Sequence, residues 1–293
     1  MVLYIALLNS SSDRKNVIYH ATSIILQREH SPAGLQAVVI NLDHRANRMT
    51  SMKSQLHKAG VPFKRFSAFN FHGGTPDVVG KTLKLLDNRI KLDVELIKKK
   101  RNMTGLLWGQ IGCWQSHLHI HLKYASGDYG STPLLILEDD VMFGPNISYF
   151  VGEQFLNNVL PKDWEMFFLD RDVLKCFDSS KTPLRPHKRL LDYFTVHYLR
   201  PPLQPDDFCL ASRVNFADAY IIRSPEVAQK LVEESNTARE KLADEYWNDR
   251  LFPQKIIHAY SLIIPAVNQG RSEFGSDIAP WGYGISGKVT SIS

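Results

Sequence analysis

The chain has 293 residues, of which 44% are hydrophobic and 22% are charged, so it carries enough apolar material for a folded core and is neither disordered nor fibrous. Lysine and arginine total 35 against 30 aspartate and glutamate, which gives a net charge of +5. This excess suits anionic ligands such as nucleotide phosphates but is too small for the basic face of a nucleic-acid-binding protein, so we expect no nucleic acid partner.

The first elements predicted along the chain are a strand, a helix and a second strand. Residues 37–42 form an apolar run rich in β-branched residues, which is typical of a buried strand. Apolar residues then recur every three or four positions up to Gly60, where we expect a helix to end. Residues 63–69 alternate apolar with polar side chains and predict the next strand.

The middle of the chain continues this alternation. Residues 77–105 have mixed charge and no sustained period, which indicates a loop with some helix. Repeated apolar positions predict helices at residues 111–125 and 148–160, and apolar runs predict strands at 134–137 and 164–169. Helices and strands that alternate in this way predict an α/β fold, with a mostly parallel central sheet flanked by helices.

The pattern is lost in residues 171–205, which are rich in proline and charge. A loop of this length in a compact domain is more often functional than idle. Regular elements return after it, and we expect a strand at 219–222, a helix that begins at Ser224 and Pro225, and a last helix at 244–251.

These elements predict one domain at residues 35–280, between an N-terminal extension at 1–34 and a flexible tail at 281–293. The apolar run at residues 2–8 is shorter than the ~18 residues that cross a bilayer, so we expect a soluble chain without a transmembrane segment. Three cysteines allow at most one disulfide and form no CxxC motif. Both the cytoplasm and the lumen of the secretory pathway stay open as locations.

Three consecutive acids, Glu138, Asp139 and Asp140, follow the run at 134–137. Carboxylates this close repel one another where a buried strand emerges, so a cation or hydrogen-bond donors should compensate them. Ligands of open α/β sheets collect beyond the carboxyl ends of the strands, and Mn²⁺ or Mg²⁺ prefers carboxylate oxygens. Because side chains alternate along an extended segment, we expect Glu138 and Asp140 to share one ion and Asp139 to point away. A solvated acidic turn is the simpler alternative.

Three histidines, His117, His119 and His121, lie on the helix before these acids. His117 and His121 are four residues apart, but a metalloprotease-type zinc motif needs a glutamate where Leu118 stands, so we expect no zinc site of that type. A helix edge that mixes packing with solvent is the simpler interpretation, with His117 nearest the end of the sheet.

Three motifs in order resemble those of glycosyltransferase family 25, which contains bacterial lipopolysaccharide and lipooligosaccharide galactosyltransferases and the procollagen galactosyltransferases. They are INLDHR with Arg48 at residues 40–48, GQIGCWQSH at 109–117 and LEDDV at 137–141. Weaker similarity extends to about residue 278. Gln110 departs from the family pattern, which usually has glutamate there. The GxGxxG, GxxxxGK[ST] and GxSxG loops are absent, so dinucleotide-binding, P-loop and nucleophilic-hydrolase functions lose their main support.

The resemblance implies a GT-A type fold that binds a nucleotide sugar and transfers the sugar with inversion, with Mn²⁺ or Mg²⁺ as cofactor. Glu138 and Asp140 would hold the metal. The residues that we assign to nucleotide-sugar binding are Asn41, Arg45, Arg48, His117 and Asp139. Taken alone, Arg45 or Arg48 could equally belong to a basic first helical turn that faces water and binds no nucleotide.

Inversion in one displacement needs a general base that takes the proton of the acceptor hydroxyl. Asp244 matches an acid of the family and is our first candidate, although it could equally cap a helix; Asp218 is the second.

The function that we expect is transfer of a hexose, with galactose or glucose favoured, from a UDP-sugar to a saccharide or a hydroxylated side chain. One alternative is a non-catalytic relative that serves as a binding or adhesion module, and Gln110 keeps it open. Another is a metal-dependent phosphohydrolase. Release of UDP from a UDP-sugar would argue against the binding module. Comparison of UDP-sugars with simple phosphate esters as substrates would test the phosphohydrolase.

Overall fold

The computed structural model describes residues 35–71, 76–100, 105–144, 147–169, 173–178, 208–214, 218–262 and 266–269. The predicted N-terminal extension, the flexible tail and most of the 171–205 loop lie outside these residues. None of the helices in the described ranges combines the length and the apolar composition that crossing a membrane requires.

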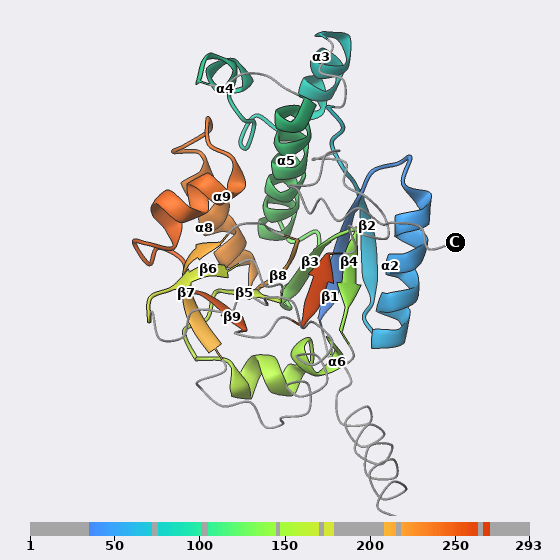
Figure 1. The fold of residues 1–293 in the computed structure, drawn as a ribbon, viewed down its shortest axis with the longest axis vertical. Helices are drawn as coiled ribbons and strands as arrows, with labels where there is room; N and C mark the ends of the chain where they lie inside the picture. The colour runs from blue at the N-terminus through green and yellow to red at the C-terminus, as the bar shows by residue number, and fades with distance from the viewer. Residues whose placement is uncertain are drawn as a thin grey trace, which may run out of the picture.

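Helices and strands are interspersed along the chain, as the sequence predicts, but the alternation is not regular, because four strands within residues 166–222 follow one another with no described helix between them (Figure 1). The strands are β1 (Gln36–Asn41), β2 (Phe63–Ser67), β3 (Leu134–Glu138), β4 (Val141–Phe143), β5 (Met166–Phe168), β6 (Val173–Cys176), β7 (Phe208–Val214), β8 (Ala219–Ile222), β9 (Ala259–Leu262) and β10 (Val267–Gln269). The helices are α2 (Ala46–Ala59), α3 (Pro76–Leu85), α4 (Val94–Lys100), α5 (Gly105–Ala125), α6 (Ile147–Phe150), α8 (Pro225–Ser235) and α9 (Ala243–Tyr246), with π-helical turns η1 (Phe155–Val159) and η4 (Trp247–Leu251).

The main sheet of the described part has eight strands in the order β2-β1-β3-β8-β5-β9-β7-β6, and β4 pairs with β10 separately. The sheet is mixed: β1 is parallel to β2 and β3, and β5 is parallel to β9, whereas the other neighbours are antiparallel. The α/β prediction is confirmed, but the mostly parallel sheet is wrong. The apolar run of β8 predicts a buried strand, but it does not indicate whether that strand runs parallel or antiparallel to its neighbours.

Both faces of the sheet are covered, which explains the nearly continuous apolar run of β1. Val38 and Ile40 belong to a core that includes side chains of α5 and α8, whereas Ala37 and Val39 belong to a second core with side chains of α2 and α6. Successive side chains of β1 therefore enter opposite cores, as the two-residue repeat of a strand requires.

The predicted helix before Gly60 is confirmed as α2, which buries Met52, Leu56 and Ala59. Gly60 ends it in the left-handed region, with φ of 69° and ψ of 22°, and its N–H donates to the carbonyls of His57 and Leu56. A residue without a side chain adopts this conformation at little cost.

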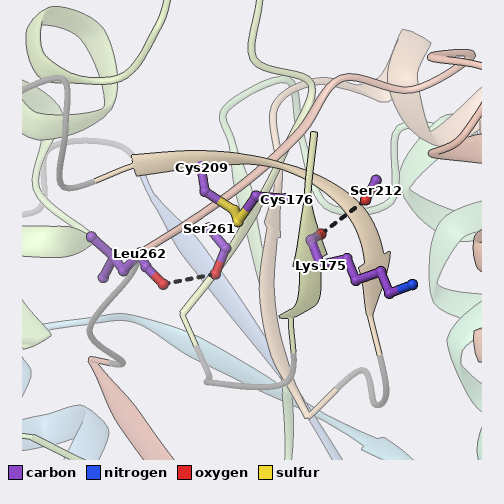
Figure 2. Close-up of a disulfide and its surroundings, with 6 residues drawn as sticks. All are labelled: Lys175, Cys176, Cys209, Ser212, Ser261 and Leu262. Atoms are coloured by element: carbon purple, nitrogen blue, oxygen red, sulfur yellow. Dashed lines mark hydrogen bonds between the residues drawn. A yellow bond between two sulfur atoms is a disulfide. The ribbon is translucent and has the colours of Figure 1, made fainter. Parts of the chain in front are cut away.

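β6 and β7 are two of the five described strands that were not predicted, with β4, β9 and β10, and a disulfide between Cys176 and Cys209 joins them (Figure 2). The two Cα atoms lie 5.6 Å apart, and 33 positions separate the two cysteines in the sequence. Cys209 pairs with Ser261 of β9 on its other side. The cysteine count allowed one bridge, but it could not indicate which cysteines form it.

Candidate functional site

Parallel pairing brings the ends of β1 and β3 together. Ile40 of β1 is in register with Glu138, so Asn41 and Glu138 end neighbouring strands at the same edge of the sheet. β8 runs antiparallel to β3, and its first residues therefore meet the end of β3. The backbone N–H of Glu138 donates to the carbonyl of Asp218 over 2.8 Å. Asn41, Glu138 and Asp218, which are far apart in the sequence, thus lie together at the carboxyl end of β3.

A buried cluster joins Asn41, Arg48 and Asp139. One Arg48 Nη lies 3.0 Å from Asp139 Oδ1, and Asn41 Nδ2 donates to Asp139 Oδ2 over 2.6 Å. Arg65 Nε in turn donates to Asn41 Oδ1 over 2.7 Å. Burial raises the pKa of Asp139 despite the hydrogen bonds from Asn41 and Arg48, which lower it. Three residues assigned to nucleotide binding therefore bind one another.

Asp140 also lies beside Arg48, with 3.8 Å between the Arg48 Nη1 and Asp140 Oδ2 atoms. Residues 139 and 140 form the turn between β3 and β4, so the alternation of an extended strand does not continue through them. We predicted that Asp139 and Asp140 point in opposite directions. This prediction is wrong, because both carboxylates lie close to the Arg48 guanidinium.

Glu138 faces helix α5 instead. The Cys113 thiol donates to Glu138 Oε1 over 3.1 Å, and His117 Nε2 lies 3.4 Å from the same oxygen. Removal from water, followed by the charges of Glu138, Asp218 and Asp140, raises the pKa of Cys113 well above its usual value. Of these three carboxylates, Glu138 is the one with a hydrogen bond from the thiol. Cys113 was not among the predicted site residues, although it precedes His117 by one helical turn within the same motif.

The three histidines of α5 are buried, so the predicted helix edge in contact with solvent is wrong. His117 Nδ1 and His121 Nε2 each lie 2.8 Å from the hydroxyl oxygen of Tyr220. His119 Nε2 accepts a hydrogen bond from the backbone N–H of Asp87 over 3.2 Å. Burial, and then the charge of His117, lowers the pKa of His121 to about 3, so this imidazole is neutral near pH 7. Tyr220, the common partner, was also missed.

The remaining assigned residues occupy different surroundings. Arg45 precedes α2, is partly exposed, and its carbonyl accepts a hydrogen bond from Asn41 Nδ2 over 3.1 Å. Asp218 is buried at the end of β3, beside Glu138. Asp244 belongs to α9, but its side chain lies outside the part that the structure describes. The site therefore contains Asp218, whereas the position of the Asp244 carboxylate stays open.

The carboxyl edge of β3 has the chemistry of a cation site. Glu138 ends β3, Asp140 follows it by two residues, and the Asp218 carbonyl accepts a hydrogen bond from the Glu138 N–H, so three acids are concentrated at this edge. Such a concentration favours a bound cation, and oxygen donors are those that Mn²⁺ and Mg²⁺ accept. Glu138 and Asp140 are donors of the predicted kind, but Glu138 faces α5 and Asp140 faces Arg48, so a metal ion shared by the two stays a prediction.

Comparisons with known proteins agree with the motifs. A family model described as Glycosyltransferase family 25 (LPS biosynthesis protein) matches residues 35–247. This range contains the strands that form the site and the acids that follow β3. A search of curated proteins found no match. Because the family model covers well over half of the chain, the protein belongs to glycosyltransferase family 25 and is a glycosyltransferase that uses a sugar donor and an acceptor.

Proposed function

We propose that the protein transfers a hexose, galactose or glucose, from a UDP-sugar to a saccharide or a hydroxylated side chain, with inversion and with Mn²⁺ or Mg²⁺ as cofactor. Family membership supports the transfer chemistry. The observation that supports the metal and the donor is the backbone hydrogen bond of 2.8 Å that joins Glu138 to Asp218 where β3 ends and β8 begins, with Asp140 two residues after Glu138. We further propose that the fold is of the GT-A type.

In this proposal Glu138 and Asp140 hold the metal. When bound, the cation would stabilise the negative charge of the departing diphosphate as a Lewis acid. Arg45 is partly exposed and would add a positive contact to the phosphates. Arg48 would act indirectly, because it forms a salt bridge with Asp139 and lies beside Asp140. His117 would orient Glu138 through its Nε2 atom.

The acceptor hydroxyl must lose its proton as it attacks the sugar. Asp218 is our candidate for the base that removes it, because it is buried and its backbone carbonyl accepts a hydrogen bond from the N–H of Glu138, a proposed metal ligand. Asp244 is the competing candidate. Loss of a general base typically lowers turnover by about 10²–10⁴-fold.

The decisive experiment is a screen of UDP-sugars with Mn²⁺ in which released UDP is measured with and without acceptors. We expect UDP-galactose or UDP-glucose to be turned over, and Mn²⁺ with UDP to raise the melting temperature. Asp140→Asn should lose both effects, whereas the exposed Asp43→Asn should keep them. Turnover unaffected by chelators would contradict the metal, and hydrolysis of simple phosphate esters in preference to UDP-sugars would contradict the transferase.

A second pair of variants separates the two candidate bases. Asp218→Asn and Asp244→Asn are compared for turnover and for stabilisation by Mn²⁺ with UDP. The variant that loses the base should lose turnover and keep the stabilisation by nucleotide. If both variants keep turnover with every active donor, neither carboxylate is the base.

A further inference from the structure

Three side chains at the edge of the candidate site bring a sulfur, a nitrogen and an oxygen together. Cys113 and His117 lie one turn apart on α5, and Glu138 ends β3. Cys113 Sγ lies 3.1 Å and His117 Nε2 3.4 Å from Glu138 Oε1, and the three atoms all lie within 4.8 Å of one another. The glycosyltransferase chemistry proposed above gives the thiol no role.

We propose that Cys113, His117 and Glu138 form a binding site for a transition-metal dication of the Zn²⁺ class. Zinc bonds of ~2.3 Å to sulfur and ~2.0 Å to nitrogen or oxygen, in a tetrahedral arrangement, place neighbouring donor atoms ~3.3–3.6 Å apart. The two separations from Glu138 Oε1 lie close to this spacing.

The surroundings of His117 hold its ring in the orientation that this site needs. Its Nδ1 atom lies 2.8 Å from the Tyr220 hydroxyl, so Nε2 is directed toward Glu138. Metal-binding histidines are commonly oriented by a partner on the other ring nitrogen, and Tyr220 supplies it. The Tyr220 hydroxyl is held in turn by His121 Nε2. His121 therefore supports the site through Tyr220 and is not a ligand itself. The metalloprotease-type motif considered from the sequence would instead use His117 and His121 together as zinc ligands.

The donor set selects a softer ion than the one proposed for catalysis. Thiolate and imidazole favour Zn²⁺ or Co²⁺, whereas Mn²⁺ and Mg²⁺ favour carboxylates. Cys113 and Glu138 are partly exposed, which gives an ion access, and three protein ligands leave a fourth position for water. Because Glu138 would serve both ions, Zn²⁺ should inhibit transfer; this consequence alone rests on the proposed function.

Co²⁺ gives a direct test, because thiolate coordination produces a near-ultraviolet charge-transfer band and tetrahedral geometry produces visible bands. The protein with its disulfide intact is titrated with Co²⁺ in the absence of nucleotide. Cys113 is then the free thiol of the chain, so the charge-transfer band has one assignment. We expect one equivalent to bind and an equivalent of Zn²⁺ to remove the bands.

Variants identify the ligands. Cys113→Ser should abolish the charge-transfer band, and His117→Gln should weaken Co²⁺ binding at least tenfold. His119→Gln is the matched control, since it lies on the same helix but faces Asp87, and it should bind Co²⁺ as the wild type does. Circular dichroism checks that each variant is folded.

The result that overturns the proposal needs no variant: a folded wild-type protein that shows no charge-transfer band with millimolar Co²⁺ has no such site. A band that persists in folded Cys113→Ser would equally contradict it. The outcome is independent of the transferase assay. A protein that turns over UDP-sugar without the cobalt band refutes only the zinc-class site, and one with the band but without turnover refutes only the proposed function.

Discussion

At one end of the sheet β1 lies between two parallel strands and is buried on both faces, whereas at the other end β6 has β7 as its partner among the described strands, and a disulfide joins the two. The first region is stabilised by apolar burial and by the buried cluster of Arg48 and Asp139. In the second, β6 is the outermost strand of the sheet among the described residues. Comparison of the two regions indicates that noncovalent packing holds the site and that a covalent bond holds the edge.

The largest effect is expected at the buried ion pair. Arg48→Met leaves the Asp139 carboxylate without its positive partner, in a pair whose side chains are only 5% and 8% exposed. We expect the free energy of unfolding to fall by about 3–5 kcal/mol, measured by urea denaturation. Adding Asp139→Asn should recover part of the loss, because it removes the uncompensated charge.

Lys123→Met is the matched control for this change, since the Lys123–Asp128 pair is about half exposed on both sides. Exposed pairs contribute about 0–1 kcal/mol, so this variant should unfold almost as the wild type does. Equal losses in the two variants would mean that the Arg48 cluster is not a stabilising feature of the first region.

The disulfide should rank next. Its cysteines are separated by 33 positions. In the chain-entropy model, closing a loop of that size raises the free energy of the unfolded chain by about 3–4 kcal/mol. The double variant Cys176→Ser with Cys209→Ser should therefore lose about this much stability. A thiol reductant should destabilise the wild type equally and leave the double variant unchanged. Identical unfolding of both proteins in oxidising buffer would contradict the covalent role of the bridge.

A smaller loss is expected where α5 approaches the loop after β2. A Cβ atom on Gly112 would lie 2.4 Å from the Phe69 carbonyl oxygen, so Gly112→Ala forces the backbone apart and should cost about 1–3 kcal/mol. Gly80→Ala in α3 is the control, because its Cβ atom meets nothing within 4 Å. Alanine favours a helix over glycine by about 1 kcal/mol, so this variant should be as stable as the wild type or more so.

The weakest predicted effect depends on pH and involves His121, which lies between the two regions. Its pKa is about 3 when folded, against about 6.5 in the unfolded chain. Between these values the unfolded chain binds a proton that the folded chain does not, so stability falls as the pH decreases from 6.5. The slope is at most about 1.4 kcal/mol per pH unit.

Urea denaturation at pH 7 and at pH 5 checks this dependence. His121→Gln keeps a group that can reach Tyr220 and removes the titration, so its stability should change less with pH than that of the wild type. Because the two proteins share every other titrating group, the difference between them reports His121. The same pH dependence in both would assign acid sensitivity to other residues.

The sequence predicted the first region better because its signals are local. The apolar run at 37–42 and the helical period before Gly60 each lie within one element, and burial on both sides of the sheet makes them strong. β6 and β7 were missed because β6 lies within the proline- and charge-rich stretch at 171–205 and β7 follows it directly. The direction of β8 follows from its neighbours rather than from its own residues.

The same distinction applies to the site. Glu138, Asp139 and Asp140 were found because consecutive acids after an apolar run are a local signal. Cys113 was missed because its role depends on the packing of α5 beside Glu138, and Tyr220 because β8 must first lie next to β3. The salt bridges that bring Asp139 and Asp140 to one arginine arise from a turn whose geometry the residue pattern does not specify.

The bridge between β6 and β7 also determines what a single break in the backbone would do. Residues 177–208 lie between the two cysteines, so hydrolysis of one peptide bond among them would leave the N-terminal and C-terminal fragments attached through sulfur. The fragments would separate only after reduction. A protease that cleaves in this interval would therefore nick the molecule without releasing either half of the sheet.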